Sequence, residues 1–138
     1  MVERDVVLSK AATVDRCLAR VAEVRARPAG ALLPVDVDDI VVLNVTRAVQ
    51  AVADLAAHLV AAEGYGLPDS LAASFTLLES HGVIDPELAT RMRQAMGFRN
   101  VAVHAYEAVD PRIVEAIAAH RIEDLRRFAA QMVARYAP

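Results

Sequence analysis

Apolar residues recur along this chain at intervals of three and four, in stretches separated by proline and glycine. Residues at that spacing share one face of a helix, and no stretch alternates strictly enough to predict a strand. Breaks fall at residues 28–34 and 64–68, at Gly82 and at Asp110-Pro111. The pattern predicts an all-α protein with about five helices, near residues 3–27, 37–63, 69–81, 85–107 and 110–136.

Four aspartates stand where these predicted helices begin. A carboxylate at such a position can accept hydrogen bonds from the free N–H groups of the first turn. Asp36 and Asp69 are predicted caps of the second and third helices. Asp85 and Asp110 are each followed by proline, which is favoured at the first helical position.

The second predicted helix carries a polar stripe at three- and four-residue spacing, so its members share one face. The stripe consists of Asn44, Arg47, Gln50, Asp54 and His58. One interpretation is a solvated face beside the apolar face that enters the core. The other is that the stripe lines a cleft, in which Arg47 or Asp54 supports catalytic residues on another helix. Periodicity does not decide between the two.

The chain has 138 residues, a length that predicts one domain, and 56% of them are hydrophobic. One small bundle cannot bury so much apolar surface, which favours a homodimer. The apolar runs are broken well before the roughly 18 residues that a membrane span requires, so no membrane association is expected. No signal peptide is evident at the N-terminus. Cys17 is the single cysteine, so no internal disulfide can form and a cytoplasmic location is expected.

The net charge of −3 argues against a protein that coats nucleic acid through a broad basic surface. It leaves open an enzyme that contacts a few phosphates locally. The four histidines show no metal-ligand spacing with cysteine or a carboxylate motif, so neither a metal nor a cofactor is expected.

Candidate chemistry gathers at the end of the fourth predicted helix, in the stretch GFRNVAVHAY from Gly97 to Tyr106. Asn100 and His104 are four residues apart and share one helix face. Arg99 and His104 are five apart, which separates them by about 140° around the axis. Arginine is long enough to reach toward a common centre, and a second copy of the helix across a two-fold axis would bring two such sets together.

These side chains suit metal-free cleavage of RNA. An imidazole can exchange a proton near neutral pH, and a guanidinium can stabilise the charge of a pentacoordinate phosphate. An amide such as that of Asn100 can orient either group. The attacking nucleophile would be the ribose 2′-OH, which DNA lacks, so DNA is not expected as a substrate. The spacing alone is also compatible with purely structural roles for Arg99 and His104.

The stretch resembles the signature of HepT-like HEPN proteins, Arg-x4-His-x-Tyr with Asn after Arg, and Arg99, Asn100, His104 and Tyr106 all match it. The resemblance extends over most of the chain. It implies a single HEPN domain over residues 1–138, as a helical homodimer whose two motifs line a cleft at the interface. It also implies catalysis by Arg99, Asn100 and His104 in a metal-independent RNA endonuclease.

The same resemblance implies a toxin of a type II- or type VII-like toxin–antitoxin pair. The expected partner is a nucleotidyltransferase antitoxin of the MNT type, which silences the nuclease by adenylylating Tyr106, by binding, or by both. A second interpretation is a catalytically silent helical module that binds a nucleotidyltransferase or a nucleotide. HEPN modules of that kind often lack the motif arginine or histidine, and this chain has both.

Overall fold

The computed structural model describes residues 1–104 and 109–138, and every regular element in these ranges is an α-helix. The helices are α1 (Arg4–Arg25), α2 (Pro34–Glu63), α3 (Leu71–Ser80), α4 (Pro86–His104), α5 (Pro111–His120) and α6 (Ile122–Tyr136). The prediction of an all-α fold is confirmed.

The predicted helix at 110–136 is two helices, because the chain turns at Arg121, where φ is −115°. The buried residues Val114, Ala118, Leu125 and Ala129 keep near-helical spacing across the turn. Periodicity therefore continues through the break and hides it from sequence reasoning.

Two of the four predicted helix caps are present. Asp85 accepts a hydrogen bond from the Leu88 N–H at 2.7 Å, and Asp110 accepts one from the Arg112 N–H at 2.8 Å. The other two predictions are wrong. Helix α2 begins earlier, at Pro34, which places Asp36 inside the first turn. The cap of α3 is the Ser70 hydroxyl, which accepts from the Ala73 N–H at 3.1 Å.

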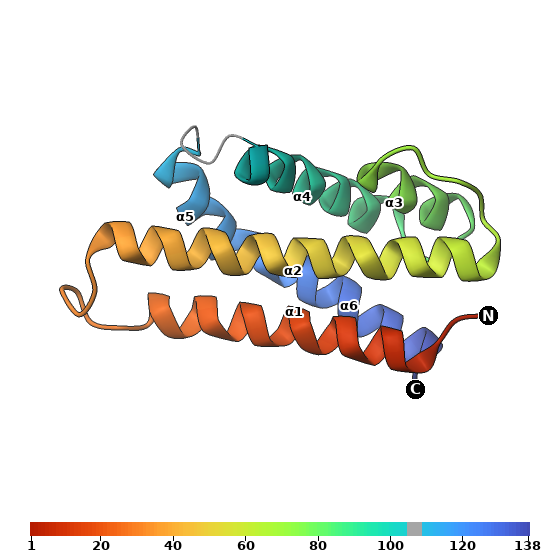
Figure 1. The fold of residues 1–138 in the computed structure, drawn as a ribbon, viewed down its shortest axis with the longest axis horizontal. Helices are drawn as coiled ribbons and strands as arrows, with labels where there is room; N and C mark the ends of the chain where they lie inside the picture. Colours follow the sequence, from red (N-terminus) through yellow and green to blue (C-terminus); the bar gives the residue numbers. More distant parts are fainter. Residues whose placement is uncertain (105–108) are drawn as a thin grey trace.

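Helix α2 is the central element and contacts all five other described helices (Figure 1). Its 30 residues have the length and hydropathy of a membrane span, the one helix in the described chain that does. More than half of its most apolar window is buried against the rest of the protein. Burial in the bundle accounts for this apolar sequence.

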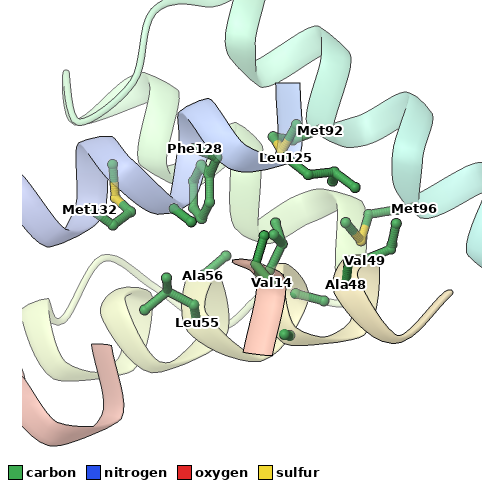
Figure 2. Close-up of a cluster of buried hydrophobic side chains, with 14 of the residues drawn as sticks. Val14, Ala48, Val49, Leu55, Ala56, Met92, Met96, Leu125, Phe128 and Met132 are labelled. Atoms are coloured by element: carbon green, nitrogen blue, oxygen red, sulfur yellow. The ribbon is translucent and has the colours of Figure 1, made fainter. Parts of the chain in front are cut away.

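The core forms where α1, α2, α4 and α6 meet, and Figure 2 shows Val14, Val49, Met92 and Phe128 converging there. Phe128 also packs edge-to-face on Phe75 of α3, with ring centroids 5.4 Å apart. These contacts fix how α4 is rotated about its own axis, and that rotation decides which residues near its end point toward α2.

Candidate active site

The three predicted catalytic residues lie in the last two turns of α4, and the core sets their directions. Met92 and Met96 are fully buried and mark the side of α4 that faces the core. Arg99 comes three residues after Met96 and continues this side, where it is half-buried. Asn100 and His104 point elsewhere and are exposed. Tyr106 lies outside the described residues.

Arg99 is attached to α2 through a hydrogen bond that was not predicted. Its Nε donates to Oε1 of Gln50 at 3.0 Å, and the Gln50 Nε2 donates to Oδ1 of Asp54 at 2.8 Å. The Lys10 ammonium of α1 then donates to Oδ2 of Asp54 at 3.1 Å. We call these four residues, Lys10, Asp54, Gln50 and Arg99, the Arg99 network. It joins the end of α4 to α2 and α1.

The Arg99 network orients side chains more than it stabilises the fold. Lys10 and Asp54 keep 35% and 42% of their side-chain surface exposed, and pairs this open contribute at most about 1 kcal/mol. The orientation of the Gln50 amide is fixed, because it needs its oxygen toward Arg99 and its nitrogen toward Asp54. The Nε of Arg99 is therefore occupied by Gln50. The Nη groups lie at the end of the Arg99 side chain, and one of them is 3.5 Å from the Asn100 amide oxygen.

His104 has different surroundings. It is the last residue of α4 and is exposed, and its imidazole forms no hydrogen bond with any other described residue. Asn100 lies one turn before it on the same face. The described chain therefore holds a fixed guanidinium and a free imidazole on different sides of one helix, as their five-residue spacing predicts, and does not bring them into contact.

The polar stripe of α2 divides into three parts. Arg47, Gln50 and Asp54 line a groove of about 580 Å³ between α1 and α2, which agrees with the interpretation of the stripe as the lining of a cleft. Asn44 also lines this groove, but its amide donates to the Ile40 carbonyl of its own helix at 2.8 Å. The His58 ring accepts the Glu3 N–H at 3.0 Å and thus supports the start of α1.

The two supporting residues proposed from the sequence differ in their contacts with Arg99. Asp54 reaches Arg99 indirectly, through Gln50. Arg47 is exposed and forms no hydrogen bond with Arg99. Lys10 was missed, because it is 44 residues from Asp54 in the chain and only the packing of α1 on α2 joins them. Within residues 1–104 and 109–138, no three His, Cys, Asp or Glu side chains converge as metal ligands would.

The sequence matches the family described as ribonuclease HepT-like over residues 16–132. The chain belongs to this family. It is 32% identical to the mRNA nuclease HepT of Shewanella oneidensis over 124 residues, which are 90% of this chain and 93% of that protein. The predicted family is thus confirmed, and the HepT-like chain is placed among ribonucleases.

Solved structures of toxin–antitoxin complexes resemble this fold closely. One is a toxin–antitoxin complex with AMP-PNP, with a TM-score of 0.86 and 31% identity. Another is the tri-AMPylated HEPN toxin of Shewanella oneidensis in complex with its MNT antitoxin, with a TM-score of 0.86 and 32% identity. Each alignment covers 94% of this chain and 98% of the compared chain. These similarities confirm the HEPN-type helical fold.

Proposed function

We propose that this HepT-like chain is the RNA-cleaving toxin of a toxin–antitoxin pair and that it works without a metal, at a composite site in a homodimer. The observation that carries the proposal is the Arg99–Gln50 hydrogen bond, which fixes a guanidinium beside an exposed helix end that carries Asn100 and His104. A cation already oriented in the resting enzyme can stabilise developing phosphate charge with little reorganisation.

In the proposed reaction the ribose 2′-oxygen attacks the adjacent phosphorus while its proton passes to a general base. The bond from phosphorus to the 5′-oxygen then breaks, and that oxygen takes a proton from a general acid. His104 performs one of the two proton transfers, and Arg99 neutralises the phosphorane. Asn100 positions one of these groups. The products are a 2′,3′-cyclic phosphate and a 5′-hydroxyl, and DNA is not cleaved because it lacks the nucleophile.

The homodimer is supported by apolar side chains that remain open near the motif. Leu43, Val101, Val103 and Ile113 are between 47% and 53% exposed. Helices α2 and α4 run antiparallel (Figure 1). Val103 lies one turn after Arg99 on α4, and Leu43 lies two turns before Gln50 on α2. Both residues therefore lie on the same side of the Arg99–Gln50 hydrogen bond. A two-fold contact over this surface would place the Arg99 of one protomer near the His104 of its partner. We define the surface of Leu43 and Val103 as the dimer face.

We further propose that an MNT-type nucleotidyltransferase is the antitoxin and that it adenylylates Tyr106. Tyr106 lies two residues after His104 in the chain, and an added phosphate there would compete with RNA for Arg99. The phenylalanine variant Tyr106→Phe should cleave RNA but escape modification. Coexpression with the nucleotidyltransferase should raise the mass of the wild type by whole AMP units and leave Tyr106→Phe unchanged. An equal mass gain in both proteins would place the acceptor elsewhere.

We also propose that residues 1–138 act as one HEPN domain in the cytoplasm. Cys17 is free and buried, so nothing in the described chain calls for an oxidising compartment.

The deciding experiment is incubation of the purified protein with RNA in the presence of EDTA, beside His104→Ala. We expect cleavage by the wild type, ends that carry 2′,3′-cyclic phosphate, and cleavage slower by about 10²–10⁴ in the variant. A strict requirement for Mg²⁺, or undiminished cleavage by His104→Ala, would refute the mechanism. A protein that cleaves nothing but still binds the nucleotidyltransferase would be the silent module instead.

A further inference from the structure

The groove between α1 and α2 is basic, although the chain as a whole is acidic. Lys10, Arg16, Arg20 and Arg47 line it, and Asp54 is its one carboxylate. The protein has 15 Lys and Arg residues against 18 Asp and Glu. Four of those 15 cations therefore meet in one groove. Clustered cations on an otherwise acidic protein mark a local binding surface for anions.

Two of these cations carry charge that no described neighbour neutralises. Arg16 and Arg47 are exposed and form no ion pair with any other described residue. By contrast, Arg20 pairs with Glu23 at 2.8 Å and Lys10 pairs with Asp54 at 3.1 Å. The negative charge of Asp54 is offset by the Lys10 ammonium, so the groove keeps a net positive charge.

The groove is also continuous with the candidate active site. Gln50 lines the groove and at the same time accepts the hydrogen bond from Arg99. Along α1, Lys10 and Arg20 are ten residues apart, a distance of about 15 Å along the helix axis. A nucleic-acid strand in helical form carries one phosphate per about 3.4 Å, so this basic row could face several successive phosphates.

We propose that the α1–α2 groove binds the phosphodiester backbone of the RNA substrate beside the cleaved bond, with Arg16 and Arg47 as phosphate ligands. This inference rests on the proposed ribonuclease function and adds a binding site to it. RNA fits better than a protein partner, because the apolar lining consists of Cys17 and Ala51, which are small and buried. The groove thus lacks the large apolar or aromatic side chains around which protein interfaces concentrate their binding energy.

The test uses fluorescence anisotropy with a labelled single-stranded RNA, at several salt concentrations. All proteins carry His104→Ala, so that cleavage is slowed and binding is measured even if the wild type proves inactive. Each phosphate contact to a single strand contributes about 0.7 to the slope of log affinity against log salt. The double variant Arg16→Gln/Arg47→Gln should therefore lose about 1.4 of slope and bind about tenfold more weakly at moderate salt. Arg16→Gln alone should lose about half of that slope.

The matched control is Arg126→Gln/Arg135→Gln on α6, which removes the same charge from outside the groove. Its slope should stay that of the parent, and circular dichroism should show equal helix content in all variants. An equal loss in both double variants would mean that only net charge matters, and the proposal would fail. It would also fail if the groove variant bound RNA normally but lost the nucleotidyltransferase, since the groove would then be a protein docking site. Absence of cleavage by the wild type would instead overturn the proposed function.

Discussion

Arg99 and His104 lie on the same short stretch of α4, but their surroundings are opposite. Arg99 is half-buried and bound to Gln50 of α2, whereas His104 is exposed and its imidazole makes no hydrogen bond within the described chain. Among the described residues, the fold has therefore oriented the guanidinium and left the imidazole open. An enzyme that acts alone gains from fixing both groups. We propose that a second copy of the chain completes the surroundings of His104.

The largest effect should come from removing either motif residue. We expect His104→Ala and Arg99→Ala to lower kcat by about 10²–10⁴, the usual contribution of a positioned acid–base or charge-stabilising group. The two sites should differ in what restores them. Added imidazole should partly rescue His104→Ala, because its site is open to solvent. Arg99→Lys should stay impaired, because an ammonium cannot keep the Nε contact to Gln50 and also reach the phosphate. Full activity in Arg99→Lys would show that orientation by Gln50 is irrelevant.

The second prediction concerns Gln50 as a positioning residue. Gln50→Leu keeps the approximate size but removes the acceptor of Arg99, and we expect kcat to fall by about tenfold or more, since hydrogen bonds to charged groups are worth about 1.5–3 kcal/mol. Gln50→Glu, which retains an oxygen for the Nε of Arg99, should recover part of kcat. Gln131→Leu on the exposed side of α6 serves as the control. If Gln50→Leu lowers thermal stability but leaves kcat unchanged, Gln50 has a structural role only.

The third prediction tests the dimer face. Val103→Asp should raise the dimer dissociation constant by at least about tenfold, because burying a valine is worth about 1.5–3 kcal/mol. Sedimentation velocity would measure this change, and activity should fall in parallel with the dimer population. Leu67→Asp is the matched control, since Leu67 is 99% exposed in the loop at the opposite end of α2. Active monomers of Val103→Asp would contradict the composite site.

The smallest effect should be an acid sensitivity of α5, the helix that follows the motif. Hydrogen bonds from the Arg112 side chain, and then from the Arg112 backbone N–H, lower the pKa of Asp110 below its ordinary value. A lowered pKa in the folded state means that this stabilisation is complete above the ordinary aspartate pKa, about 3.9. It is lost as the pH falls through the folded pKa. Asp110→Asn should remove this acid-dependent part of the melting temperature, as followed by circular dichroism against pH, while kcat at neutral pH is unchanged.

Much of this protein could be read from its sequence because the signals are local. Three- and four-residue periodicity and the proline and glycine breaks located five helical segments, the last of which is two helices in the structure. Asp85 and Asp110 correctly predicted two helix starts, because a capping carboxylate and the N–H group that donates to it lie within three residues of each other. Arg99, Asn100 and His104 could be proposed as site residues because they lie within two turns of one helix. Their relative directions followed from helical geometry alone.

Contacts between distant segments had no such signal. The turn at Arg121 leaves the apolar periodicity unbroken. The Arg99 network joins residues from three helices, and its members come together only because α2 packs against both α1 and α4. Packing also determined that Gln50, rather than Arg47, accepts the hydrogen bond from Arg99. Hydrophobic burial sets the rotation of each helix, and the sequence fixes which side chains share a face but not which face of another helix they will meet.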